Sequence, residues 1–137
     1  MVITNYIEVK TLGEGQPLDI TAQVTKEVEA GGLASGIATL FVAGSTPICR
    51  GTIESATGLL DDLTELWERL VPRSGAYRHN RIDDNGHAHL RAHLLGPSLT
   101  IPLVDGHLPL GTWQQIVLVD FDTRPRQRRV IVQLVGE

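Results

Sequence analysis

All five histidines of this 137-residue chain fall between Tyr77 and Gln114, and four of them lie within residues 79–93. The stretch contains His79, His87, His89 and His93, interleaved with Asp83, Asp84 and Asn85. Imidazole and carboxylate groups together are the set that metal binding and proton transfer require. For any single histidine the alternative is ordinary hydrogen bonding in a polar loop, but the concentration of imidazoles favours a functional site.

The spacing of these histidines supports a site in either kind of secondary structure, with different members. In a β-strand His87, His89 and His93 would all share one face. In an α-helix His89 and His93 would align, and His87 would point elsewhere. Three imidazoles with an open coordination position are a common catalytic zinc set, and Asp83 and Asp84 could orient them from outside. The spacing matches no strict zinc signature.

A glycine turn, Gly111-Thr112, leads into Trp113 and Gln114. Glycine lets a backbone come close to a ligand, and the Gln114 amide offers both a donor and an acceptor. The alternative is an ordinary strand start. We expect Trp113 in the core or at a subunit interface, because its large apolar ring needs cover. His107 is expected in a turn near the site.

Three hydroxyl side chains, those of Ser45, Thr46 and Ser98, are candidates for binding phosphate oxygens together with backbone N–H groups. No P-loop pattern accompanies them. No nucleophile elbow and no dinucleotide fingerprint occurs, which disfavours a hydrolase triad or a nicotinamide enzyme. Cys49 follows Ile48 in an expected strand, which indicates an inert buried thiol.

The bulk composition indicates one globular domain over residues 1–137, with 42% hydrophobic and 20% charged residues. A net charge of -4 argues against a nucleic-acid binder. The single cysteine excludes an intrachain disulfide. No apolar run approaches the roughly 18 residues that span a bilayer, and residues 1–9 do not resemble a signal peptide. We expect a cytoplasmic protein with neither nucleic acid nor membrane as partner.

The hydrophobic pattern predicts mostly strands, with two main helices at residues 20–28 and 59–70. Strands are expected at residues 2–9, 36–42, 48–54, 99–103 and 129–135, with a hairpin-like pair from residues 108–110 and 113–121. The apolar segment 36–42 reads as a central strand buried on both faces, and the polar turn 43–47 after it as a ligand contact. Pro102 places its strand at an edge or a bulge. The fold class is therefore α+β with a largely antiparallel sheet.

A series of motifs in fixed order carries a family resemblance. They are Tyr77-Arg78-His79, Asp84-Asn85-Gly86-His87-Ala88-His89-Leu90, Leu94-Leu95-Gly96-Pro97-Ser98, Asp105-Gly106, Leu110-Gly111-Thr112-Trp113-Gln114 and the closing segment 128–137. With these motifs the chain resembles the YjbQ family, also catalogued as the uncharacterised protein family UPF0047, nearly end to end. The resemblance implies a small α+β domain that assembles as a homotrimer. In some members it implies a secondary thiamine-phosphate synthase activity.

The resemblance also implies site residues. His79, His89 and Gln114 match family positions, which makes them the catalytic candidates. Most members carry a His-Thr-Thr turn, whereas this chain has Gly44-Ser45-Thr46. We therefore expect His87 to replace the missing imidazole, so that His79, His87 and His89 hold a divalent metal, zinc or magnesium. Glu54 is expected where the family often has a carboxylate.

The implied reaction joins a pyrimidine pyrophosphate to a thiazole phosphate at a subunit interface. Pyrophosphate leaves as an anion, so metal, backbone donors or an arginine, Arg91 or Arg78, must neutralise it. The expected ligand is thus a small phosphorylated molecule or anion. One alternative is a non-catalytic trimeric module that binds a metal or an anion. Another is that the histidines only stabilise the assembly.

Overall fold

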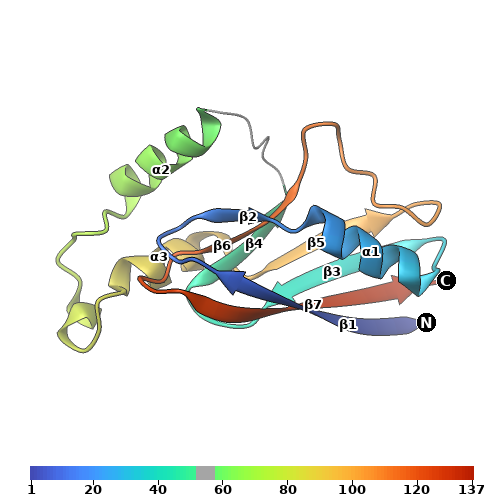
Figure 1. Cartoon of the computed structure of the whole chain (residues 1–137), viewed down its shortest axis with the longest axis horizontal. Coiled ribbons are helices and arrows are strands. Elements are labelled where there is room, and N and C mark those ends of the chain that lie inside the picture. The colour runs from blue at the N-terminus through green and yellow to red at the C-terminus, as the bar shows by residue number, and fades with distance from the viewer. Residues whose placement is uncertain (52–57) are drawn as a thin grey trace.

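Two antiparallel sheets form the body of the chain (Figure 1). The computed structural model describes residues 1–51 and 58–137. One sheet has the strand order β1-β7-β3-β5 and the other β2-β6-β4. The strands are β1 (Val2–Thr11), β2 (Pro17–Asp19), β3 (Gly36–Val42), β4 (Pro47–Gly51), β5 (Ser98–Leu103), β6 (Ile116–Asp120) and β7 (Arg126–Gly136). The helices are α1 (Thr21–Gly31), α2 (Leu59–Leu70), the 3-10 helix η1 (Arg78–Arg81) and α3 (Gly86–Leu95). The predicted α+β class with antiparallel pairing is confirmed.

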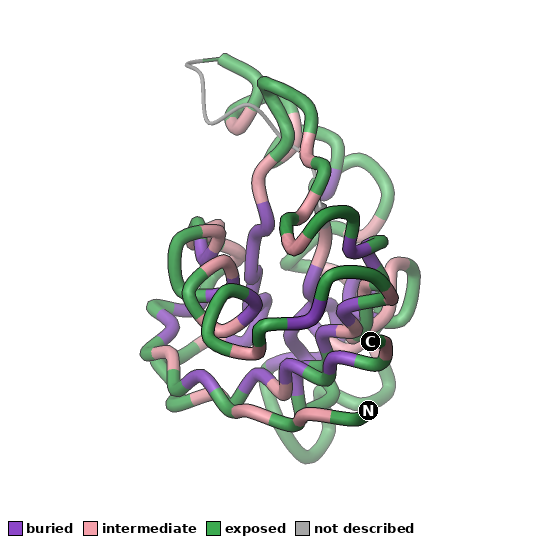
Figure 2. Tube along the Cα trace, turned by 90° about the vertical axis from the view of Figure 1, so that its right-hand side faces the viewer, coloured by how far each residue is buried: buried purple, intermediate pink, exposed green. Residues whose placement is uncertain are grey.

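The layers follow from the alternation of side chains along the strands. The inner face of the four-stranded sheet, centred on Leu40 and Val132, packs against α1 and one face of the three-stranded sheet. The other face of the three-stranded sheet packs against α2 and α3 through a second core in which the Trp67 and Phe121 rings meet edge to face at 5.0 Å. In Figure 2 buried residues gather toward the interior of the body and exposed residues lie around them.

The strand predicted at residues 36–42 is present, but the expectation that both its faces are buried is wrong for the single chain. Ala38, Leu40 and Val42 are buried, whereas Ile37 is 42% and Phe41 41% exposed. No further layer of the described chain covers the outer face of this sheet. The edge position predicted from Pro102 is confirmed, because β5 pairs with β3 alone.

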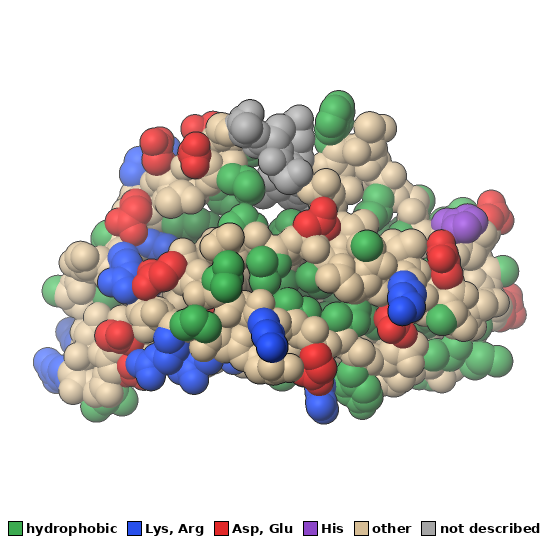
Figure 3. Space-filling model, in the orientation of Figure 1, with side chains coloured by type: hydrophobic (Ala, Val, Ile, Leu, Met, Phe, Trp, Pro, Cys, Tyr) green, Lys and Arg blue, Asp and Glu red, His purple; other side chains and the backbone are tan. Residues whose placement is uncertain are grey.

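Helix α2 has the predicted bounds and stands off the body at the upper left of Figure 1. Trp67 is its buried residue, whereas Leu59, Leu66 and Leu70 remain exposed. Its acidic side chains face solvent as expected, and Figure 3 shows them gathered over the helix. No helix in residues 1–51 and 58–137 is long and apolar enough to cross a membrane.

The predicted hairpin of residues 108–110 with 113–121 is wrong. Strand β6 begins only at Ile116 and pairs with β2 and β4. The preceding residues form turns, in which Leu110 N–H donates to Leu108 and Gln114 N–H to Gly111. Pro109 has no N–H to give to a ladder, which helps to explain the irregular path. Trp113 is 67% exposed, so a core position is excluded within the chain.

The buried Cys49 thiol leads to a first prediction. Its removal from water raises its pKa to about 12, so almost no thiolate exists at neutral pH. We expect a maleimide reagent to leave the native protein unlabelled at pH 7 and to label it fully in denaturant, as read by mass spectrometry. Rapid stoichiometric labelling of native protein would contradict the buried position.

Candidate functional site

Two of the predicted histidines meet where η1 approaches α3. Asn80 in η1 accepts the Gly86 N–H at 2.9 Å, which ties the 3-10 helix to the first turn of α3. This contact brings His79 beside His89. Their ring centroids are 4.7 Å apart at an interplanar angle of 74°, an edge-to-face arrangement. The histidine pair His79 and His89 is thus formed by segments ten residues apart in sequence.

A hydrogen-bonded chain of three side chains fixes the tautomer of His79. Asn85 Nδ2 donates to Asp122 Oδ1 at 3.2 Å, because a carboxylate can only accept. Asn85 Oδ1 is then turned to His79 Nε2, 3.0 Å away, which must donate its hydrogen. The neutral ring consequently keeps its lone pair on Nδ1. His79 is held as a base or metal ligand at that nitrogen.

Asp122 remains an anion at the end of this chain. Burial by itself would raise the pKa of Asp122, but hydrogen bonds from Arg126, Asn85 and the Thr123 N–H outweigh burial and lower it. The Arg126 Nε hydrogen bond is 2.9 Å long and the Thr123 N–H bond 2.8 Å. A permanent negative charge is thereby placed behind Asn85 and His79.

A second buried carboxylate, Asp120, anchors the turn between β3 and β4. Its oxygens accept hydrogen bonds from Thr11 Oγ1 at 3.0 Å, Thr46 Oγ1 at 2.9 Å and Arg128 Nε at 2.7 Å. Arg128 also donates to Thr46 Oγ1 at 2.7 Å. Gly44 lies on that guanidinium with a φ of 129°, and a Cβ there would be 2.8 Å from Arg128 Nη1. The turn therefore requires glycine at this position.

Two surface hollows share His89 of the histidine pair. One, of about 290 Å³, is lined by Gly44, Ser45, Thr46, His79, Asp83, Asn85, His89, Asp122, Arg126 and Arg128. The other, of about 340 Å³, is lined by Gly44, Ser45, Pro47, His89, Ala92, His93, Gly96 and Pro97. Within the described residues the N–H groups of Gly44 and Ser45 donate no hydrogen bond. The site thus combines free backbone donors, two guanidinium groups and two imidazoles, which suits an oxyanion such as phosphate.

His87 does not join the histidine pair. Because the segment is the helix α3, the helical alternative holds: His89 and His93 share a face while His87 points into the protein, where it is 1% exposed. Burial, and next the nearby Arg91 and Arg73 cations, lower the pKa of His87. No three His, Cys, Asp or Glu side chains in residues 1–51 and 58–137 are grouped to hold a metal. The expected convergence of His79, His87 and His89 is therefore absent from the single chain.

Several other candidates are used structurally. Arg91 is buried, donates to the Val71 carbonyl at 2.9 Å and pairs with Glu68 at 2.8 Å, so it ties α3 to α2 instead of facing the hollows. Thr46 lines a hollow, but its hydroxyl serves Asp120. Ser45 is exposed and lines both hollows. Arg78 lines a third hollow that also includes His79 and His89.

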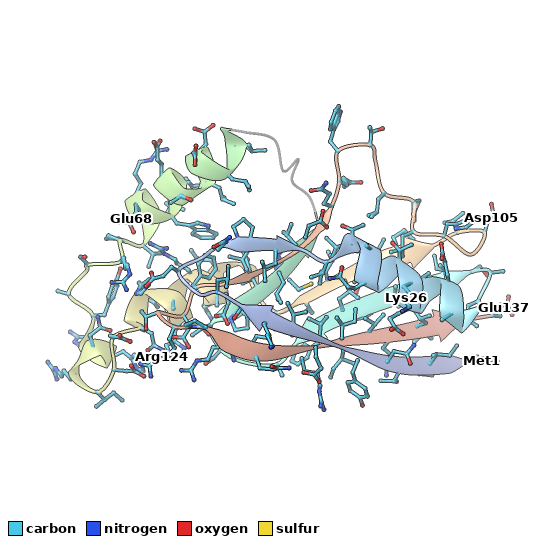
Figure 4. All side chains as sticks on the ribbon, viewed as in Figure 1. Met1, Lys26, Glu68, Asp105, Arg124 and Glu137 are labelled. Carbon is cyan, nitrogen blue, oxygen red and sulfur yellow. The ribbon has the colours of Figure 1, made fainter. Side chains whose placement is uncertain are left out.

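The remaining candidates, Gln114, Ser98 and His107, line neither of the two hollows that share His89. Gln114 Oε1 accepts the Gly111 N–H at 2.8 Å and closes its own turn. Ser98 is exposed, and its carbonyl accepts from Arg50 at 2.7 Å. His107 was expected near the site, but it follows Asp105, which Figure 4 places at the opposite end of the molecule from Arg124. Glu54 lies outside the described residues.

The predicted role of Asp83 and Asp84, to orient the histidines, falls instead to Asn85 and Asp122. The two aspartates lie within 3.6 and 3.7 Å of Arg124, and Asp84 also accepts from the Thr123 hydroxyl at 2.8 Å. Asp120 and Asp122 are not among the site residues predicted from the sequence. The signal was an Asp-Phe-Asp run directly after an apolar strand, followed by Arg126 and Arg128 at the same spacing of two.

Comparison with known proteins identifies the family of the chain. The family described as UPF0047 protein YjbQ-like matches residues 5–137. A UPF0047 protein of Methanothermobacter thermautotrophicus is 38% identical over 99% of this chain and 94% of its own length. A UPF0047 protein of Archaeoglobus fulgidus is 41% identical over 93% of this chain and 97% of its own length. A YbjQ-like protein of unknown function from Sulfolobus solfataricus superimposes with a TM-score of 0.94 at 38% identity, over 100% of this chain and 99% of that one. This chain therefore belongs to the YjbQ-like UPF0047 family.

Proposed function

We propose that the chain binds a phosphorylated small molecule in the hollows between the histidine pair and the Gly44-Ser45 turn. The observation that carries the proposal is the Asp122, Asn85 and His79 chain, which keeps His79 Nδ1 unprotonated in the neutral ring. A proton on Nδ1, or a divalent metal, zinc or magnesium, bound in the same site, places positive charge beside the ligand. The carboxylate behind Asn85 stabilises that charge.

The arginines of the site support the same ligand class. Arg126 is paired with Asp122 through Nε alone, and its side chain is 41% exposed, so its terminal N–H groups are available to an anion. Arg128 is more enclosed and is shared between Asp120 and Thr46. Two carboxylates offset the two guanidinium groups, so specificity for a phosphate would come from directed donors more than from net charge.

The reaction that the family resemblance implies is chemically compatible with such a site. In it the C–O bond to the pyrimidine methylene breaks, pyrophosphate leaves with the electron pair, and the thiazole nitrogen forms the new C–N bond. The protein must stabilise the leaving anion. The Gly44 and Ser45 N–H groups, the Ser45 hydroxyl and Arg126 are the groups we assign to that task.

The proposal includes a homotrimer with the site at a subunit interface. The outer face of the four-stranded sheet carries uncovered apolar side chains, including Tyr6, Ile37, Phe41 and Val135. Trp113 and Gln114 are exposed on the segment before β6, away from the histidine pair of their own chain. Assembly would cover Trp113 and could place Gln114 at a neighbour's site. Light scattering gives the mass: three times 14.9 kDa is expected.

Substitution of His79 tests the proposed site. We expect His79→Ala to lower turnover of the pyrimidine pyrophosphate and thiazole phosphate pair by about 100-fold or more, the usual effect of losing a positioned proton-transfer or ligand group. Calorimetry with inorganic pyrophosphate should show weaker binding in the same variant. His107→Ala, at the opposite end of the molecule, is the matched control and should behave as wild type.

The outcomes separate the alternatives. If the wild-type protein binds pyrophosphate but shows no turnover, the result supports the alternative of a non-catalytic binding module. Unchanged binding and turnover in His79→Ala would contradict the proposed site. Loss of the trimer in that variant would instead support a structural role for the histidines.

A further inference from the structure

Helix α3 presents a second pair of imidazoles to the site, His89 and His93. They are four residues apart and both well inside the helix Gly86–Leu95, so they lie on one face one turn apart. Both line the hollow of about 340 Å³ whose opposite wall includes Gly44 and Ser45. Two helical turns and the glycine turn therefore enclose one space.

Both imidazoles are free to bind a ligand. Among the described residues neither the His89 nor the His93 side chain makes a hydrogen bond, and His93 is exposed to solvent. His79 differs, because its Nε2 is committed to Asn85. Histidines at positions i and i+4 of a helix are the arrangement by which zinc sites of the His-x-x-x-His kind hold their metal. The segment His89-Leu90-Arg91-Ala92-His93 has that spacing.

We propose that His89 and His93 form a two-histidine site for a divalent transition metal. Its remaining coordination positions open into the hollow toward Gly44 and Ser45. Imidazole favours zinc, copper, nickel and iron over magnesium, which would prefer oxygen ligands. Since no group of three such ligands occurs in residues 1–51 and 58–137, the other positions are left to water or to an oxygen of a bound anion. An open position is what distinguishes a reactive metal site from a structural one.

This assignment gives the two histidine pairs different tasks. His89 belongs to both, since it packs against His79 at 4.7 Å between ring centroids. His93 belongs only to the proposed metal site with His89, and it lines only the hollow of about 340 Å³. The inference deepens the proposed function by naming where the metal is held. Metal binding is nevertheless measurable without any phosphate ligand, so it can fail or hold independently of the proposed reaction.

Zinc titration by calorimetry on the intact protein, at neutral pH and without phosphate, tests the site. We expect wild type to bind one zinc per chain, reversibly with a chelator. His93→Ala and His89→Ala should each weaken zinc binding at least tenfold. His79→Ala and His107→Ala should bind zinc as wild type does. Because His93 is exposed, His93→Ala is also expected to keep the wild-type melting temperature in the absence of metal.

Two results would overturn the inference. One is wild-type zinc affinity in His93→Ala. The other is a loss in His79→Ala as large as that in His89→Ala, which would assign the metal to His79 and His89. A wild-type protein that binds no zinc also rejects it, while leaving pyrophosphate binding at the Gly44-Ser45 turn to be judged separately.

Discussion

Replacement of Asp120 by alanine is expected to lower the free energy of unfolding by about 3–5 kcal/mol, the range for breaking a buried ion pair from one side. Asp120 is 1% exposed. Its removal leaves the Arg128 guanidinium, 16% exposed in its side chain, without its 2.7 Å partner. It also removes the acceptor of the Thr11 and Thr46 hydroxyls. These groups join β1, β7 and the turn after β3, so the loss affects both sheets.

Glu8 provides a matched control for this change. Its carboxylate is also 2.7 Å from an arginine, Arg129, but both side chains are exposed. Glu8→Ala should therefore cost less than about 1 kcal/mol. Urea denaturation followed by circular dichroism measures both. Equal costs for Asp120→Ala and Glu8→Ala would contradict the argument. Adding Arg128→Met to Asp120→Ala should recover part of the stability, because it removes the orphaned charge.

The regular elements could be predicted because their signals are local. Leu59 to Leu70 repeats apolar side chains with helical spacing, and helix α2 has those bounds. Residues 129–135 alternate, and β7 extends the predicted strand by only a few residues. Each pattern is set by one element meeting one apolar surface, so it appears in the linear sequence.

The predictions are wrong at two kinds of position. At one, an apolar surface is not covered by the chain itself; at the other, a turn is held by hydrogen bonds between residues close in sequence. Residues 36–42 carry apolar side chains on both faces of the strand, a pattern that predicts burial of both faces. In the single chain, however, Ile37 and Phe41 are exposed. In the segment before β6, Gln114 satisfies its own turn through Gly111, an arrangement that hydrophobic periodicity does not register. The sequence shows that a side chain is apolar, but not which surface will cover it.

The sequence predicts the histidines of the site but not the carboxylate behind them, for a similar reason. His79 and His89 are near in sequence and were identified from their density. Asp122, which sets the tautomer of His79 through Asn85, lies 37 residues from Asn85 and reaches it only after β6 is placed. His87 is expected at the site because it lies two residues from His89 and would replace the histidine missing from the Gly44-Ser45-Thr46 turn. In helix α3 residues two apart point in different directions, so His87 points into the core while His89 faces the site.

The uncovered sheet face leads to the other prediction of large effect. We expect Phe41→Asp to convert the proposed trimer into monomers. Phe41 projects from the outer face of β3, beside Ile131 on β7 and Ser98 on β5. It is 41% exposed in the single chain, so the substitution removes little packing within it. In an interface the new carboxylate would lose its hydration without a partner, which is costly enough to prevent association.

Light scattering measures the mass, and thermal unfolding at low protein concentration measures the stability of the single chain. Phe41→Asp should show the 14.9 kDa mass of one chain while retaining its secondary structure. Leu12→Asp is the control, because Leu12 is an exposed apolar residue beyond the end of β1. A Phe41→Asp protein that keeps the mass of wild type would place the interface elsewhere. If it dissociates and also loses pyrophosphate binding, the site needs a neighbouring chain; binding by the monomer would show that the histidine pair and the Gly44-Ser45 turn suffice.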